Sequence, residues 1–118
     1  MSSNRVTSYD LEPVSTENPN QILVSIGGEL DLTNAGDFEE RLETLAQDRS
    51  SLLLDLRRVA FIDSAAVHVL FRIARRLGKE RFGLVFEPES AVTRTLEIVG
   101  VHDVATTGGS VEELTAAL

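Results

Sequence analysis

The sequence lacks several features that would narrow its function at once. It contains no cysteine, which excludes disulfide bonds and thiolate metal sites and is consistent with a reducing compartment. No apolar run approaches the roughly 20 residues that a membrane-spanning helix needs. Residues 1–5 lack the apolar segment of a signal peptide. We therefore expect a cytoplasmic protein that does not insert into a membrane.

Positive charge and aromatic side chains are also scarce. Lys and Arg total 11 against 19 Asp and Glu, so the net charge is −8, and aromatic residues make up 5% of the chain. An acidic protein is repelled by nucleic acid and by anionic membrane surfaces, and few aromatic side chains are available to stack on bases. We therefore expect no direct contact with nucleic acid.

The chain has the length and composition of one globular domain, with 118 residues, of which 42% are hydrophobic and 25% charged. We predict strands over residues 6–14, 22–26, 52–54, 82–86 and 101–105, and helices that follow Thr33, Ser64, Ser90 and Ser110. Pro13 and the turn-forming residues 15–20 make the first two strands a hairpin at an edge. Because strands and helices then alternate, we predict a single α/β domain with a mixed, mainly parallel β-sheet and about four helices packed on it.

One central segment organises the rest of the chain. Residues 52–54 are an apolar run that suits a central strand, and a short connection follows it. Apolar residues then recur at helical spacing from Val67 to Leu77, and Gly78 ends the predicted helix. Ser64 stands directly before this helix, where its hydroxyl can accept a hydrogen bond from a free backbone N–H as the N-cap.

Ser64 is a candidate switch as well as a candidate cap. A phosphate there would sit at a helix N-terminus, where backbone N–H groups and the helix dipole favour an anion. The fold should tolerate the phosphate, while up to two negative charges would appear beside Asp63 and near Asp31. A partner that docks on this surface would be repelled. Serine is a common cap, so the residues alone leave both roles open.

The same residues could in principle form the catalytic site of an enzyme. Ser64 and His68 are four residues apart and fit one helix face, and with Asp63 or Asp31 they could form a serine–histidine–carboxylate arrangement. The Gly-x-Ser-x-Gly elbow of hydrolases is absent, and spacing alone does not aim the imidazole at the hydroxyl. We favour a solvated surface position for His68 and predict that the chain is not an enzyme.

A metal or cofactor site has equally little support in the sequence. Asp31 and Asp63 are expected at one end of the sheet, and paired carboxylates can hold Mg²⁺. However, the sequence offers no His/Asp cluster with ligand spacing, and Gly27-Gly28 lacks the lysine and the glycine pattern of a phosphate-binding loop. We therefore predict neither a metal nor a cofactor.

The outer face of the helix after Ser64 is basic. It carries Arg72, Arg75 and Arg76, with Lys79 just beyond. Cations near a helix C-terminus are favoured by the helix dipole, so a solvated helix face explains these residues. A docking surface for an acidic partner is the alternative, and the sequence leaves both open.

Several groups of residues together resemble the STAS domain family, and within it the bacterial anti-sigma factor antagonists. They are Gly28-Glu29-Leu30-Asp31, Leu54-Asp55-Leu56, Phe61-Ile62-Asp63-Ser64, and Ser90-Ala91-Val92 with Val99-Gly100-Val101. The first and third groups at this separation are more specific together than either is alone. The resemblance covers nearly the whole chain, so we assign residues 6–118 to a STAS domain and residues 1–5 to a flexible N-terminus.

The resemblance implies a mixed sheet with helices on one side, and a mode of action. Family members that are unphosphorylated bind an anti-sigma factor, which is a serine kinase of the histidine-kinase-like ATPase class, and so release the sigma factor. The kinase phosphorylates the serine after Phe-x-Asp, here Ser64, and a serine phosphatase reverses this step. The implied partner-binding residues are Asp31, Asp63, Ser64, Ala65, Ala66, His68 and Arg72, in a protein expected to be a monomer or weak dimer.

The chain departs from the family pattern directly after the candidate phosphoacceptor. The motif commonly continues Asp-Ser-Ser-Gly-Leu, whereas this chain has Asp63-Ser64-Ala65-Ala66-Val67. Alanine favours helix by up to about 1 kcal/mol over glycine, so a stiffer helix start is expected. Other STAS proteins act without phosphorylation, as scaffolds or as subunits of lipid-transport or signalling complexes, and this is the alternative function.

Overall fold

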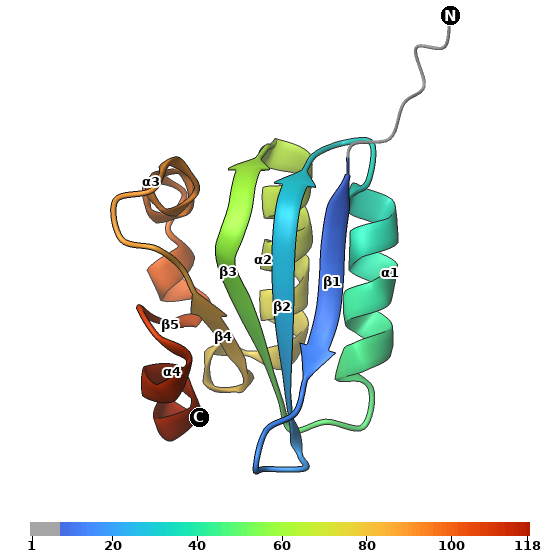
Figure 1. Ribbon diagram of the computed structural model, residues 1–118, viewed down its shortest axis with the longest axis vertical. Helices are drawn as coiled ribbons and strands as arrows, with labels where there is room; N and C mark the ends of the chain where they lie inside the picture. Colours follow the sequence, from blue (N-terminus) through green and yellow to red (C-terminus); the bar gives the residue numbers. More distant parts are fainter. Residues whose placement is uncertain (1–7) are drawn as a thin grey trace, which may run out of the picture.

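The computed structural model describes residues 8–118, and the predicted flexible N-terminus, residues 1–5, lies outside them. Figure 1 shows a twisted sheet with helices packed against it. The strands are β1 (Tyr9–Val14), β2 (Gln21–Leu30), β3 (Ser51–Ile62), β4 (Phe82–Val85) and β5 (Thr106–Gly108). The helices are α1 (Ala35–Ala46), α2 (Ser64–Leu77), α3 (Ala91–Ile98) and α4 (Val111–Ala117), with short 3₁₀ helices η1 (Lys79–Arg81) and η2 (Val101–Asp103). Strands and helices follow one another in the predicted order.

The strands form one five-stranded sheet in the order β1-β2-β3-β4-β5. β1 runs antiparallel to β2, and each later neighbouring pair is parallel. Parallel neighbours need a crossover between them, and α1, α2 and α3 supply these crossovers. The predicted α/β domain with a mixed, mainly parallel sheet is therefore confirmed.

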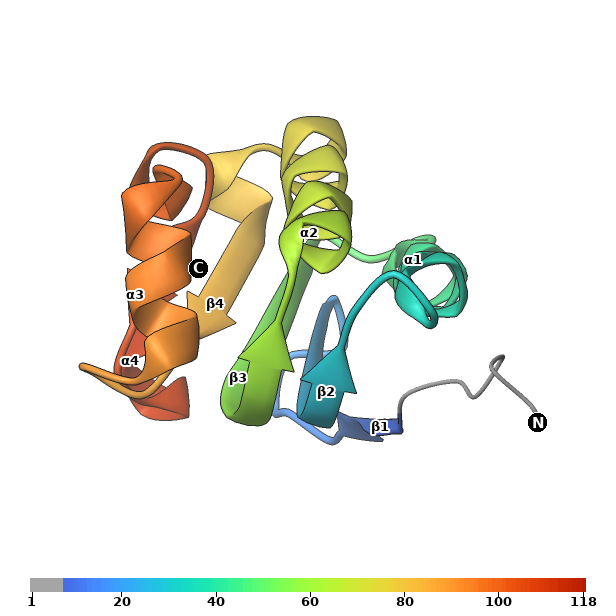
Figure 2. The ribbon, with the colours of Figure 1, turned by 90° about the horizontal axis from the view of Figure 1, so that it is seen from above.

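The central strands are buried on both faces. In β3, Leu52 and Leu54 join the main core with residues of α1, α2 and α3, whereas Leu53 points to the other face and packs with Leu114 of α4. A continuous apolar run in a strand places side chains on both faces, and both need cover. Figure 2 shows α1 and α2 on one side of β2 and β3. The expectation that all helices pack on one side is therefore wrong for α4.

Two strands are longer than predicted. β2 does not end at Gly27-Gly28 but continues to Leu30, and β3 includes residues 57–61, which were predicted to be a connection. The register between the two strands shifts at Ser25/Gly27 and at Gly28/Glu29, and Gly28 has a positive φ of 94°. A register shift of this kind allows a strand to continue past an irregular residue. Glycine tolerates the positive φ that Gly28 adopts there.

The last strand also differs from the prediction. Residues 101–105 form the 3₁₀ helix η2 and a turn, and β5 occupies residues 106–108, which were predicted to be a loop. Val101 and Ala105 are buried, and the N–H of Ala105 donates to the carbonyl of Val101 at 3.1 Å. Apolar residues four apart suit a helical turn better than the alternation of a strand.

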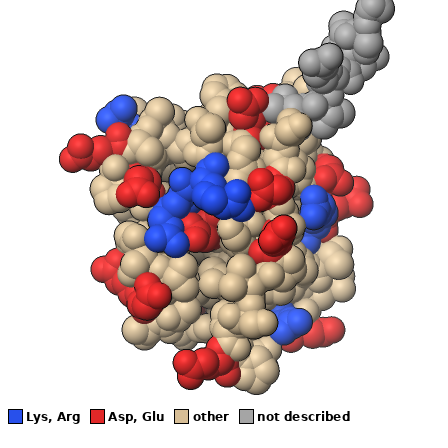
Figure 3. Space-filling model, in the orientation of Figure 1, with Lys and Arg blue, Asp and Glu red and all other residues tan. Residues whose placement is uncertain are grey.

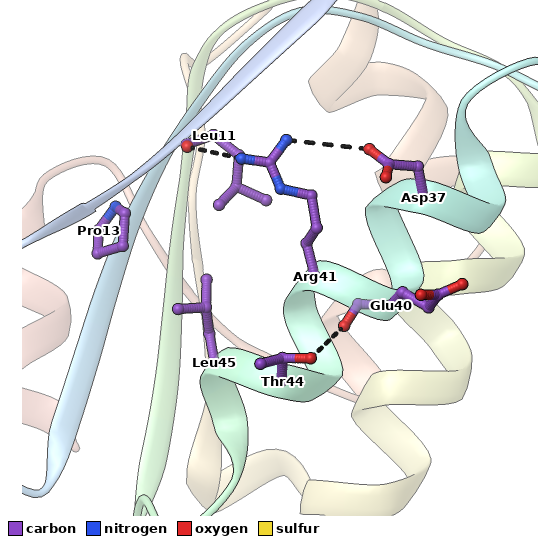
Figure 4. Close-up of a pocket in the computed structure, with 7 residues that line it drawn as sticks. All are labelled: Leu11, Pro13, Asp37, Glu40, Arg41, Thr44 and Leu45. Atoms are coloured by element: carbon purple, nitrogen blue, oxygen red, sulfur yellow. Dashed lines mark hydrogen bonds and ion pairs between the residues drawn. The ribbon is translucent and has the colours of Figure 1, made fainter.

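The free edge of β1 is covered by Arg41 of α1 (Figure 4). Its Nη2 donates to the carbonyl of Leu11 at 3.3 Å, and its Nη1 donates to the hydroxyl of Tyr9 at 3.2 Å. Pro13 has no N–H to offer a further strand. An open strand edge is a template for pairing with another chain. Arg41 and Pro13 interrupt this template at two neighbouring outward positions.

Tyr9 provides a spectroscopic probe of this edge. Its hydroxyl donates to Oδ2 of Asp37 at 2.6 Å, and its ring packs edge-on against buried Phe38. Burial, followed by the hydrogen bond to Asp37, raises the pKa of Tyr9 from its usual 10.0 to about 12, against the opposing effect of Arg41. The fold therefore favours the neutral phenol.

We predict that the Tyr9 phenolate titrates near pH 12 in the folded protein and near pH 10 in the unfolded chain. Because the folded pKa is raised, this contribution to stability is complete below pH 10 and is lost as the pH rises towards 12. Tyr9 is the sole tyrosine and tryptophan is absent, so the ultraviolet absorbance change at alkaline pH reports one group. Circular dichroism verifies folding at each point.

Two substitutions should shift the pKa of Tyr9 in opposite directions. Asp37→Asn should lower the pKa of Tyr9, whereas Arg41→Gln should raise it further, because the two side chains act on the phenol in opposite directions. Shifts of the same sign in both variants, or a folded midpoint near 10, would show that the described hydrogen bonds do not form.

Candidate functional site

Two loops meet where β2 and β3 end, and they carry the predicted site. Leu30 and Ile62 are register partners at the carboxyl ends of these strands, and the N–H of Asp63 donates to the carbonyl of Leu30 at 3.1 Å. The loop after β2 begins with Asp31, and α2 begins directly after Asp63. The predicted proximity of these two aspartates therefore follows from the parallel register.

Ser64 is not the cap of α2, contrary to the prediction. Asp63 is the N-cap, with extended backbone angles, and its Oδ1 accepts from the N–H of Ala66 at 3.1 Å. Ser64 is the first residue of the helix and is exposed. A carboxylate at the N-cap also interacts favourably with the positive end of the helix dipole. The hydroxyl of Ser64 is therefore not engaged in starting the helix.

The carboxylate of Asp63 also holds the neighbouring loop. Its second oxygen, Oδ2, accepts from the N–H of Leu32 at 3.0 Å. One half-buried side chain thus fixes the start of α2 and the path of the loop after β2. The position of Ser64 relative to that loop is set by this pair of hydrogen bonds.

The loop from Asp31 to Asn34 is held in place largely by hydrogen bonds between its own residues. Oδ1 of Asp31 accepts from the N–H of Thr33 at 2.9 Å and from its hydroxyl at 2.6 Å. Thr33 is not the N-cap of α1 as predicted, because Asn34 occupies that position. The buried Asn34 side chain accepts from the N–H of Asp31 at 3.0 Å and donates to the carbonyl of Glu29 at 2.9 Å. An amide has a separate acceptor oxygen and donor nitrogen, and Asn34 uses both to join the two ends of this loop.

The remaining predicted contact residues differ in their access to a partner. Ala66 is fully buried (0% exposed), so it offers no side chain to a docking surface, and Ala65 is half-buried against the core. His68 is exposed on α2. Arg72 is exposed but forms two hydrogen bonds of 2.8 Å to the carboxylate of Glu39 on α1, which lower the pKa of Glu39.

The basic face of α2 is therefore tied in part to α1. Arg76 pairs with Glu43, as Arg72 pairs with Glu39, so two of the predicted basic residues join the two helices. Exposed ion pairs contribute little to stability, and they leave less positive charge for a partner.

On the face of the molecule drawn in Figure 3, positive and negative charges are also balanced. Figure 3 shows basic side chains near the middle of this face, with acidic ones around them. Arg57 forms hydrogen bonds of 2.9 and 2.8 Å with the carboxylate of Asp55, and Arg58 bonds Asp10 at 2.6 Å. These arginines lower the pKa of both aspartates. The positive charge on this face is thus paired with carboxylates.

The geometry around Ser64 does not form a catalytic triad. Among residues 8–118, no hydrogen bond joins Ser64 to His68, and both oxygens of Asp63 accept backbone N–H groups. No group of three or more His, Cys, Asp or Glu side chains in this range is arranged to hold a metal ion. Within the same residues, no helix is long and apolar enough to cross a membrane. What the arrangement offers is an exposed hydroxyl on the first turn of a helix.

Two exposed apolar residues at the same end of the sheet as Ser64 were not assigned to the site by the sequence reasoning. The side chain of Leu32 is 78% exposed and that of Phe61 is 50% exposed. Leu32 stands among polar loop residues, and Phe61 lies at an outward position near the end of β3. The sequence did offer one signal for Leu32, because it is a single apolar residue between the polar residues Asp31 and Thr33.

Known proteins are similar to this chain in sequence. The sequence model of the STAS domain family matches residues 12–114. The anti-sigma-F factor antagonist RsfB of Mycobacterium tuberculosis is 32% identical over 81 residues, which are 67% of this chain and 66% of that protein, just under two thirds of its length. The anti-sigma-B factor antagonist of Bacillus subtilis is 30% identical over 89 residues, 75% of this chain and 82% of that protein.

A solved structure extends the similarity to the whole fold. The crystal structure of an anti-sigma factor antagonist from Mycobacterium paratuberculosis superposes with a TM-score of 0.77 at 23% identity, covering 92% of this chain and 93% of that one. The match of the family model over residues 12–114 takes in both loops of the site and the whole of α2. The chain belongs to the STAS domain family.

Proposed function

We propose that this STAS protein is an anti-sigma factor antagonist that binds an anti-sigma factor kinase through the surface around Ser64 and is released when Ser64 is phosphorylated. The similarity to named antagonists supports the antagonist role. The observation that carries the switch is the exposed hydroxyl of Ser64, which forms no hydrogen bond within residues 8–118 and is left free by the Asp63 cap. The kinase has a histidine-kinase-like ATPase fold, and a serine phosphatase restores the unmodified form.

A phosphate on Ser64 fits the first turn of α2. Helix N-termini leave backbone N–H groups without intrahelical partners. Asp63 satisfies the N–H of Ala66, whereas no acceptor among the described residues binds the N–H of Ser64 or Ala65. These two groups and the dipole of the 14-residue helix favour an added anion. The modified chain therefore keeps its fold.

The same phosphate changes the docking surface. The surface already carries the carboxylates of Asp31 and Asp63, and phosphorylation adds between one and a half and two negative charges, by the usual phosphate pKa. The dianion must also keep its water, so a partner packed closely over Ser64 loses contact. Repulsion and retained hydration act in the same direction and switch binding off.

Incubation with the cognate kinase and ATP should place a single phosphate on Ser64. Ser64 is exposed and its hydroxyl is free of intramolecular hydrogen bonds in the described chain, so it can enter a kinase active site. Peptide mapping by mass spectrometry locates the phosphate, and Ser64→Ala should abolish its incorporation. Ser15, exposed at the other end of the sheet, is the internal comparison. Labelling of Ser64→Ala at the wild-type level would refute the assignment.

Ser64→Glu should weaken binding to the ADP-bound kinase by about tenfold or more, which corresponds to at least about 1.4 kcal/mol. The added carboxylate carries part of the charge of a phosphate, and Ser64→Ala should bind nearly as well as the wild type. Calorimetry or biolayer interferometry gives the affinities. Ser15→Glu introduces the same charge far from Ser64 and is the matched control. Equal affinities for Ser64→Glu and Ser15→Glu would contradict the proposal.

A further inference from the structure

Two large apolar side chains are exposed at the end of the sheet where β2 and β3 lead into the site. Only five large apolar side chains among residues 8–118 are exposed, and Leu32 (78%) and Phe61 (50%) are two of them. Single exposed apolar residues are common, but neighbouring ones mark interaction surfaces. This pair gains little from folding and can bury apolar area only in a complex.

The strand register places both residues at the same end of the sheet. Phe61 lies opposite Glu29 near the ends of β3 and β2. Leu32 lies in the loop that follows β2, and its N–H donates to Oδ2 of Asp63 at 3.0 Å. Ser64 is the next residue after Asp63. Ser64 therefore begins α2 at the end of the sheet that carries one exposed apolar side chain on the loop after β2 and one near the end of β3.

We propose that Leu32 and Phe61 are the apolar anchors by which this surface docks on the anti-sigma factor kinase. This inference rests on the proposed function and adds the residues that supply the affinity. In protein interfaces a few desolvated apolar or aromatic side chains carry most of the binding free energy, and a polar border excludes water. A phosphate on Ser64 would bring charge and hydration to the end of the sheet that carries the two anchors, where the contact would otherwise be dry.

The charged residues near Leu32 and Phe61 indicate what charge the partner surface should carry. Glu29 is exposed and lies opposite Phe61, while the half-buried Asp31 precedes Leu32 and the half-buried Asp63 binds its N–H, so carboxylates lie near both apolar residues. Complementary interfaces place opposite potentials against each other. The kinase surface that fits here has apolar depressions for Leu32 and Phe61, and Lys or Arg side chains at their border.

Asp63 is a positioning residue in this surface. Its carboxylate binds the N–H of Leu32 and caps α2 at the same time. The amide of Asn has a single acceptor oxygen and can maintain one of these two hydrogen bonds, not both. Asp63→Asn should therefore weaken kinase binding by freeing the loop that presents Leu32.

Leu32→Ser and Phe61→Ser should each weaken binding to the ADP-bound kinase by about tenfold or more, as expected for truncated anchors. Both side chains are at least half exposed, so their unfolding midpoints in urea should match the wild type. Val14→Ser is the matched control: Val14 is 43% exposed and pairs with Leu23. Leu23 is seven residues, or about 23 Å of strand, from the site end of β2.

The outcomes separate this inference from the proposed function. If the wild type binds and Ser64→Glu weakens binding, but Leu32→Ser and Phe61→Ser bind like Val14→Ser, the anchors are refuted and the antagonist role stands. Loss of affinity in Ile98→Ser instead, at the end of α3, would place the anchors elsewhere and overturn the inference. If the wild type does not bind the kinase, both proposals fall.

A double-mutant comparison tests the role of Asp63. Asp63→Asn should reduce affinity several-fold in the wild-type background and have little further effect in the Leu32→Ser background, because its effect passes through Leu32. Equal losses in the two backgrounds would show that Asp63 acts by its own contact with the kinase, and would refute its positioning role.

Discussion

The two hydrogen bonds of the Asp63 carboxylate are the constraint on which this site depends. One fixes the first turn of α2 through Ala66, and the other fixes the loop after β2 through Leu32. Replacing an N-cap carboxylate usually costs about 1 kcal/mol, and here the same change also releases a loop. Because Asp63 performs the capping, the adjacent Ser64 is exposed and available for modification.

In the proposed function, stability and switching depend on different residues. The core is formed by apolar side chains on both faces of β2, β3 and β4, and Ser64 contributes nothing to it. Ala66, two residues after Ser64, is fully buried and helps to seat α2 on the sheet. Because alanine favours a helix, we expect a charge added to Ser64 to act on the surface and to leave the packing of Ala66 unchanged.

Much of this architecture could be predicted from the sequence, and the errors have physical causes. The alternation of strands and helices, the edge hairpin with Pro13 and the caps Ser90 and Ser110 are all present. The N-cap of α2 was predicted one residue too late, because Asp63 and Ser64 are both good caps and only the backbone angles decide between them. The exposed positions of Leu32 and Phe61 depend on the register of β2 with β3, and local sequence does not encode that register.

We propose that phosphorylation of Ser64 changes the surface of the protein and leaves its fold unchanged. The most direct test measures the urea unfolding free energy and the kinase affinity on the same phosphorylated and unphosphorylated preparations. We expect unfolding free energies within about 0.5 kcal/mol of each other, as for other surface changes, together with an affinity at least about tenfold weaker for the phosphorylated form. A loss of several kcal/mol of stability, or an unchanged affinity, would contradict it.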